Sequence, residues 1–130
     1  MIDHIDHIVL TTSDEAACID FYVGLLGMRL ETFGANRKAF VFGSQKINLH
    51  VKGSEFEPKA HLPVPGALDL CFIVAIPLEQ VVERLREHSA TIVEGPVRRT
   101  GARGPIESVY LRDPDLNLIE LSRYLAPASA

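Results

Sequence analysis

The same order of predicted elements occurs twice in this chain, and that repeat limits the fold more than any other feature. Residues 4–52 predict one strand, one helix and three further strands, and residues 67–125 predict the same order. Residues 53–66 hold three prolines and two glycines, which is typical of a connector. We therefore expect an α+β fold, with two βαβββ modules in a single domain that covers residues 1–130.

The first module shows its elements through residue type and spacing. Strands are predicted at residues 4–12, 28–33, 37–42 and 46–51, from β-branched and apolar runs that are bounded by turn residues. A helix follows the first strand, with Ser13 or Asp14 as its N-cap and Gly27 at its end. Its predicted core-facing stripe consists of Ala17, Phe21 and Leu25, with Cys18 as a further member.

The second module repeats this order with a longer basic segment. Strands are predicted at residues 68–74, 91–93, 108–112 and 117–124. Pro77 suits the first turn of a helix, whose apolar stripe is Leu78, Val81, Val82 and Leu85. Residues 96–105 contain three arginines and two glycines between their prolines and predict a mobile basic loop.

One carboxylate stands out on the last predicted strand. Glu120 lies in the run Asn-Leu-Ile-Glu-Leu, where an ionised side chain has no packing role. Alternation places it on the face of Leu118 and Ser122, opposite Ile119 and Leu121. Ionised carboxylates are rarely buried unless they are paired or bind a metal. The sequence therefore indicates that Glu120 meets a partner, and we expect that partner to be a metal ion.

Placing one module over the other suggests which residues accompany Glu120. When the two modules are aligned, His7 is matched with Asp69, 62 residues later, and His50 is matched with Glu120, 70 residues later. If the modules are related by a pseudo-two-fold axis, these four positions face one another, and all four side chains can ligate a divalent cation. The alternatives remain open for each residue: a satisfied core histidine for His7, a half-exposed strand end for His50 and a turn cap for Asp69.

The composition excludes several classes of function. Hydrophobic residues make up 47% and charged residues 23%, as in an ordinary globular domain, and the net charge of −4 gives no general attraction to nucleic acid or to an acidic membrane. We find neither a membrane-spanning run nor a signal peptide, and we expect a cytoplasmic protein. Cys18 and Cys71 make no disulfide framework and are each expected to be small buried side chains.

Three segments give the chain its resemblance to a known family. These are DHIVLTTSDEAACIDFYVGLLGM at the start, FGSQKINLH before the connector and RDPDLNLIELSRY near the end. With them the chain resembles the vicinal oxygen chelate superfamily, which includes glyoxalases, bleomycin resistance proteins and extradiol dioxygenases. It is most similar to small proteins of the glyoxalase-domain-containing protein 5 type, from EFEPKA, DLCFI and GPVRRTGARGP. Three positions depart from the usual pattern. Glyoxalase I types commonly have a carboxylate or Gln at the position of His50, glyoxalase I types and extradiol dioxygenases have a ligand His at that of Asp69, and members often have glycine at that of Leu116.

The resemblance implies a fold, a cofactor and a general chemistry. It implies two βαβββ modules that form a cup-shaped mixed sheet around a divalent metal such as Fe, Ni, Zn or Mn. It implies His7, His50, Asp69 and Glu120 as ligands, with Glu120 also as a catalytic base, and a small substrate that chelates the metal through adjacent oxygens. The activity would be of the glyoxalase-like lyase or isomerase type, or of the ring-cleaving dioxygenase type, in a homodimer.

Two other kinds of function are compatible with the same resemblance. Resistance proteins of the superfamily bind drugs without a metal, and other members transfer a group to an antibiotic. The chain has ligand-type residues at all four positions, which favours the metal-dependent enzyme over the metal-free binding protein. We could not identify the residue pattern of the group-transfer enzymes.

Overall fold

The computed structural model describes residues 1–126, which form two compact units. Unit 1 comprises residues Met1–Leu68 together with Pro114–Asn117, and unit 2 comprises Asp69–Asp113 together with the chain from Leu118 onward. Each unit contains one strand, a helical segment and three further strands, so the predicted βαβββ order is confirmed in both. The predicted domain runs to residue 130, and its last four residues lie outside the described part.

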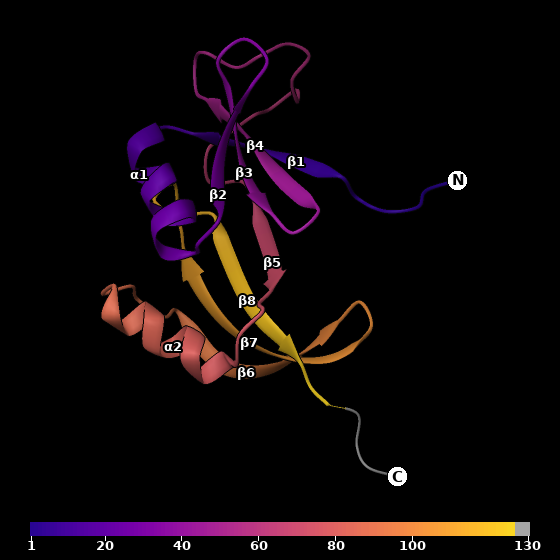
Figure 1. Cartoon of the computed structure of the whole chain (residues 1–130), viewed down its shortest axis with the longest axis vertical. Helices are drawn as coiled ribbons and strands as arrows, with labels where there is room; N and C mark the ends of the chain where they lie inside the picture. The colour runs from indigo at the N-terminus through magenta and orange to yellow at the C-terminus, as the bar shows by residue number, and fades with distance from the viewer. Residues whose placement is uncertain (127–130) are drawn as a thin grey trace. The chain divides into compact units, whose positions relative to one another are not determined.

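Unit 1 is a four-stranded mixed sheet with a helical segment after its first strand (Figure 1). Its elements are β1 (His7–Thr12), α1 (Glu15–Ile19), η1 (Asp20–Leu25), β2 (Arg29–Phe33), β3 (Arg37–Phe42) and β4 (Gln45–Val51). The strand order is β1-β4-β3-β2, with β1 parallel to β4 and the other pairs antiparallel. Only the β1–β4 pair needs a long crossover, because parallel strands cannot be joined by a hairpin.

The helical segment of unit 1 begins and ends as its residue types predict. The Asp14 side chain accepts a hydrogen bond from the Ala17 backbone N–H, and Gly27 follows the last turn at φ +77°. The buried stripe is Cys18, Tyr22 and Leu25, so the prediction of Ala17 and Phe21 was wrong by one position. Tyr22 lies in the π-helical turn η1 and stacks on Phe40 of the sheet with ring centroids 5.1 Å apart.

Unit 2 has the same topology as unit 1 (Figure 1). Its elements are β5 (Asp69–Ile73), α2 (Leu78–Glu87), β6 (Glu94–Gly101), β7 (Gly104–Arg112) and β8 (Leu118–Tyr124), in the sheet order β5-β8-β7-β6. Helix α2 packs on β7 and β8 through Leu78, Val81 and Leu85, as its apolar spacing predicts. The sheet face beneath it includes the buried Val109, Leu111, Ile119 and Leu121.

The segment that was predicted as a basic loop is instead a β-hairpin. Strands β6 and β7 pair from Glu94 and Tyr110 to Gly101 and Gly104, so both the loop and the short strand at 91–93 were wrong predictions. A β-bulge between Glu94 and Val97 accommodates Pro96, whose ring cannot donate to a regular ladder. Gly95 adopts φ +108° there, and a side chain at that position would meet the backbone of Ser108.

The turn at residues 114–117 belongs to unit 1 and is fastened to the end of β1. The Asp115 carboxylate accepts hydrogen bonds from the Ser13 backbone N–H at 2.9 Å, from the Ser13 hydroxyl at 2.6 Å and from the Thr12 hydroxyl. Burial acts to raise the pKa of Asp115, but these hydrogen bonds outweigh it and hold that pKa below its usual value. Leu116 in this turn adopts φ +70°, a conformation that favours glycine.

The structure also bears on the two cysteines and on the expected lack of a membrane-spanning segment. Cys18 is fully buried, whereas Cys71 is exposed, so the prediction of a buried side chain was correct only for Cys18. Within residues 1–126, no helix has both the length and the apolar character that crossing a bilayer requires.

Candidate functional site

One face of the unit 1 sheet carries polar side chains from three adjacent strands. The parallel register sets Val9 opposite Asn48 and Thr11 opposite His50, so these four side chains share a face. The opposite face carries the aliphatic and aromatic core, with Leu10, Phe40, Ile47 and Leu49 all buried. The polar face therefore needs a partner other than the helical segment.

Polar atoms on this face are buried without a hydrogen-bond partner among residues 1–126. They are the two ring nitrogens of His50, Oδ1 of Asn48 and Nε of Arg37. Arg37 precedes Ala39 by two residues, and Ala39 is the register partner of Asn48, so Arg37 shares their face. Buried polar groups are nearly always satisfied in folded proteins, and a cluster of exceptions indicates a position where another molecule binds.

Phe56 of the connector brings His50 and Arg37 into one environment. Its ring centroid lies 5.6 Å from that of His50, and the Arg37 guanidinium lies 4.9 Å from the same centroid. His50 is only 2% exposed. Burial, and then the positive charge of Arg37, hold the pKa of His50 below its ordinary value of 6.5, so the imidazole is neutral at pH 7. A neutral imidazole offers one donor and one acceptor.

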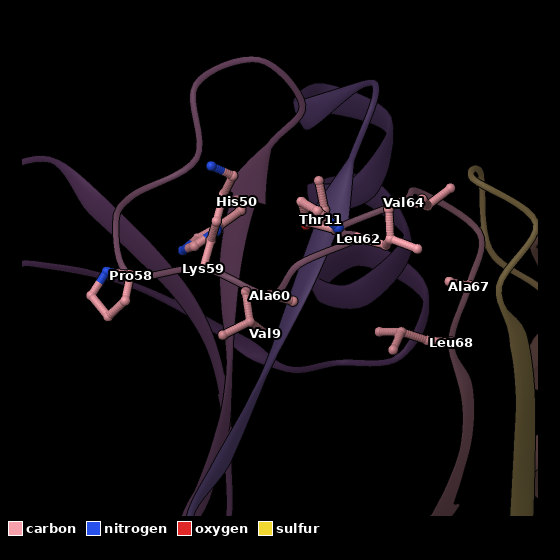
Figure 2. Close-up of a pocket in the computed structure, with 11 residues that line it drawn as sticks. Val9, Thr11, His50, Pro58, Lys59, Ala60, Leu62, Val64, Ala67 and Leu68 are labelled. Atoms are coloured by element: carbon pink, nitrogen blue, oxygen red, sulfur yellow. The ribbon is translucent and has the colours of Figure 1, made fainter.

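A pocket of about 300 Å³ opens beside His50. Figure 2 shows Val9 and Thr11 from β1 and His50 from β4 among the lining side chains, and the other lining residues lie between Pro58 and Leu68. Most of these connector side chains are aliphatic, and Leu62 and Val64 are 73% and 56% exposed. Binding sites for small molecules are commonly apolar cavities of this size or larger, with a few polar groups that fix orientation.

His7 lies on the same face as His50 but in different surroundings. Its side chain is 43% exposed, and its Nδ1 lies 2.7 Å from the Asp6 carboxylate. In the register of β1 and β4 it is opposite Lys46, four residues from the pair that contains His50. At about 3.3 Å per residue, the two histidines are separated by roughly 13 Å along the strands. Unit 1 therefore does not bring His7 and His50 side by side.

Unit 2 places Glu120 at the centre of the sheet face that α2 leaves uncovered. Glu120 is opposite Cys71 on β5 and opposite Tyr110 on β7, and Asp69 lies two residues before Cys71 on the same face. The predicted alternation is confirmed, because Ile119 and Leu121 point to the buried side. Asp69 and Glu120 thus share one face within unit 2.

Two buried serines hold the carboxylate of Glu120. The Ser108 hydroxyl donates to Oε2 at 2.6 Å, and the Ser122 hydroxyl lies 3.4 Å from the same oxygen. The two hydroxyls are also hydrogen-bonded to each other at 2.6 Å, and both serines are fully buried. Hydrogen bonds to a charged acceptor are short and strong, so this pair fixes the direction of the carboxylate.

Arg99 and Arg103 of the β6–β7 hairpin contact other side chains of unit 2. Arg99 donates to the Tyr110 hydroxyl at 3.2 Å and to Glu94 at 3.1 Å, and the Arg103 guanidinium lies 4.4 Å from the Tyr124 ring centroid. Burial and the nearby Glu120 carboxylate raise the pKa of Tyr110, although Arg99 opposes them. Arg99 thus contacts Tyr110, which is the register partner of Glu120 on this face.

The strand registers show that the two proposed equivalences between the modules exclude each other. His7 is opposite Lys46 in unit 1, and Asp69 is opposite Leu118 in unit 2. If His7 is matched with Asp69, the offset between β4 and β8 is 72, from 118 − 46, and Asn48 corresponds to Glu120. If His50 is matched with Glu120, their partners Thr11 and Cys71 are matched, and the offset between β1 and β5 is 60, from 71 − 11.

The predicted metal ligands match a divalent cation by chemical type. Imidazole and carboxylate donors together suit Zn, Fe, Ni and Mn, and unpartnered ring nitrogens such as those of His50 are available for coordination. The geometry gives less support for a metal site, because residues 1–126 contain no group of three or more His, Cys, Asp and Glu side chains arranged to hold a metal. Each unit presents two of the four predicted residues on one sheet face.

Three residues of the unit 1 face were missed in the sequence. Asn48 interrupts an apolar strand in the same way as Glu120, and alternation with His50 could have identified it. Arg37 and Phe56 gave no such signal, because one begins a strand and the other lies in a connector. Their placement depends on tertiary packing.

Comparison with known proteins places the chain in a family. Residues 4–121 match the family model described as the Glyoxalase/Bleomycin resistance protein/Dioxygenase superfamily. Virulence protein STM3117 of Salmonella typhimurium is 56% identical over 96% of this chain and 87% of its own length, and the TM-score to its crystal structure is 0.94.

Two further relatives have comparable identity. Glyoxalase domain-containing protein RDO1 of Mycosarcoma maydis is 58% identical over 92% of this chain and 68% of its own length. The structure of an integron cassette protein from V. cholerae is 51% identical, with a TM-score of 0.94 over 96% of this chain and 98% of that one. The chain belongs to the Glyoxalase/Bleomycin resistance protein/Dioxygenase superfamily.

Proposed function

We propose that this protein is a metal-dependent enzyme acting on a small substrate that chelates the metal through adjacent oxygens. The observation that carries the proposal is the fixed carboxylate of Glu120, held by Ser108 at 2.6 Å on a sheet face that also presents Asp69. A carboxylate whose direction is fixed by hydrogen bonds is suited to meet a cation or a substrate. Family membership supports the same class of chemistry.

His7, Asp69 and Glu120 are the residues that we propose to hold the metal, whereas His50 lies roughly 13 Å from His7 along the strands and cannot bind the same ion as His7. His7 and Asp69 are each the first residue of the first strand of their unit, and each of these strands pairs in parallel with the last strand of that unit, which supports a common role for them. A divalent cation, when bound, supplies Lewis acidity toward the oxygens of a substrate. Glu120 is positioned to hold or to move a proton, since Ser108 fixes the direction of its carboxylate. The reaction is either a glyoxalase-like isomerisation or lyase step or a ring-cleaving oxygenation.

Metal analysis tests this proposal. We expect protein purified without chelator to contain a divalent metal, and we expect His7→Ala and Glu120→Ala to lose most of it. His61→Ala, in the exposed connector, is the matched control and should retain the wild-type content. A wild-type protein that is free of metal and does not take up added Ni, Zn, Mn or Fe would refute the metal-dependent enzyme.

A metal-free binding protein is the second candidate, and the pocket beside His50 favours it. The pocket has about 300 Å³ and mostly aliphatic walls, and the connector leaves Leu62 and Val64 exposed at its edge. A binding protein of this kind would retain a small apolar ligand after complete removal of metal by a chelator. Cytoplasmic location and assembly as a homodimer complete the proposal and are expected for either candidate.

A further inference from the structure

The face of unit 1 offers hydrogen-bonding groups that together specify the polar end of a ligand. Nε of Arg37 is a donor only, because the guanidinium stays protonated, and Oδ1 of Asn48 is an acceptor only. The two ring nitrogens of His50 supply at least one further donor. A ligand that satisfies this set must bring acceptor oxygens for Arg37 and His50 and a hydrogen-bond donor for Asn48.

Burial makes these requirements strict. His50 is 2% exposed and Asn48 is 5% exposed, and Phe56 covers both His50 and the Arg37 guanidinium. A polar group that is removed from water without a partner costs far more than one at the surface. Each of these atoms that a ligand leaves unsatisfied therefore lowers its affinity, whereas a ligand that pairs most of them gains several hydrogen bonds at once.

The pocket borders this polar group at His50, which lines it together with Thr11 and with Val9, the register partner of Asn48. The residues between Pro58 and Leu68 contribute proline, alanine, valine and leucine side chains and Lys59 to the remaining wall. The volume of about 300 Å³ lies at the small end of the range for ligand sites, roughly 300–1,000 Å³. A ligand that fits this combination has one polar end and a short hydrocarbon body.

We propose that Arg37, Asn48 and His50 bind the head group of a short-chain hydroxylated carboxylic acid, whose hydrocarbon tail occupies the pocket beside the connector. The carboxylate accepts from Arg37 and from His50, and the hydroxyl donates to Asn48. The inference rests on the proposed function only in taking this protein to bind a small molecule, and it names the class of that molecule. It assigns Arg37 and Asn48 to recognition and not to metal binding.

Binding of four defined probes to metal-stripped protein in excess chelator tests the proposal. The probes are 2-hydroxyhexanoate, hexanoate, hexane-1,2-diol and lactate, measured by titration calorimetry. We expect 2-hydroxyhexanoate to bind most tightly, because hexanoate lacks the hydroxyl, the diol lacks the carboxylate and lactate lacks the tail. The absence of binding by all four, or equal binding of hexanoate and 2-hydroxyhexanoate, would overturn the proposal.

Variants identify the atoms responsible. Arg37→Gln should weaken 2-hydroxyhexanoate binding about tenfold or more, as expected for a lost hydrogen bond to a charged group. Asn48→Leu should remove the preference for the hydroxylated acid over hexanoate. Arg29→Gln is the matched control, since Arg29 is an exposed arginine of β2 that contacts Glu31, and it should bind within about twofold of wild type.

The selectivity of the wild-type protein among the four probes stands as a test even where a variant fails to fold. Wild-type affinity in Arg37→Gln would overturn the assignment of the carboxylate. Failure of the proposed metal chemistry is distinguishable from failure of this inference, because every measurement is made without metal. A protein that binds metal but no acid contradicts only the acid site.

Discussion

His50 is the residue whose surroundings depart most from those of an ordinary surface histidine. It is buried between Phe56 and the strands of unit 1, near the Arg37 charge, with no hydrogen bond to either ring nitrogen from the described residues. It also lines the pocket beside the connector. A buried histidine without hydrogen bonds is expected to lower folding stability in acid.

The lowered pKa of His50 predicts how stability depends on pH. The unfolded chain binds this proton near pH 6.5, while the folded protein binds it only at lower pH. Between these two values the unfolded state holds more protons, so the free energy of unfolding rises with pH. The stabilisation is complete above about pH 6.5 and is lost progressively as the pH falls below it.

Urea unfolding between pH 7 and pH 5 measures this dependence. We expect wild-type stability to fall across this range and His50→Gln to show a shallower fall. His61→Gln removes an exposed histidine of the connector and should follow the wild-type curve. Identical pH profiles for wild type and His50→Gln would contradict the assignment.

Ser108 is predicted to matter through Glu120. Ser108→Ala removes the 2.6 Å hydrogen bond to Oε2 and leaves Ser122 at 3.4 Å. We expect a loss of about 1–3 kcal/mol in the free energy of unfolding. We also expect roughly tenfold weaker metal affinity, as is typical when a residue that orients a ligand is removed. Ser44→Ala, in an exposed turn, should change neither the free energy of unfolding nor the metal affinity. Unchanged metal affinity in Ser108→Ala would contradict the assignment of Glu120 as a metal ligand.

At the scale of elements, the predicted order of strands and helices was correct in both units. Apolar periodicity and turn residues were enough to place β3 at residues 37–42 and to place both helices. The hairpin β6–β7 was missed because prolines, glycines and arginines conceal a strand that depends on a bulge at Gly95 and Pro96. The helical stripe was shifted by one position because Cys18, Tyr22 and Leu25 also keep spacings of four and three residues, and periodicity alone could not choose between the two sets.

The turn before β8 carries a measurable strain. Leu116 adopts φ +70° with its side chain 67% exposed, so the side chain contributes little burial to offset the unfavourable backbone. Leu116→Gly should therefore raise the free energy of unfolding by about 1 kcal/mol. Leu116→Ala keeps the Cβ atom, and hence the strain, and should stay within about 0.5 kcal/mol of wild type. Equal stability of the two variants would show that the turn is not strained at this residue.

Aligning the two modules in the sequence did not give the register of their strands. A shift of two residues preserves the face of every side chain, so alternation alone could not choose between Asn48 and His50 as the counterpart of Glu120. The hydrogen-bonded pairs of β1 with β4 and of β5 with β8 show that matching His7 with Asp69 excludes matching His50 with Glu120. The same pairs bring Asn48 into the polar group that composition and motif had not identified.

For the whole molecule, the family and the fold were predictable and the site was predictable only in part. The three segments around His7, His50 and Glu120 predicted the superfamily that the family model confirms. The metal set of His7, His50, Asp69 and Glu120 stays a prediction, because each unit supplies two of these residues. Arg37 and Phe56 join the site through packing of the connector, which no local pattern in the sequence indicates.

Metal-dependent turnover is the measurement that tests the central claim most directly. Chelator-treated protein should be assayed against a panel of hemithioacetals and catechols, before and after separate addition of Fe, Ni, Zn and Mn. We predict turnover of one substrate class that requires added metal and that falls at least 100-fold in Glu120→Gln, while His61→Gln retains it. Turnover that persists without metal, or that is unchanged in Glu120→Gln, would contradict the account.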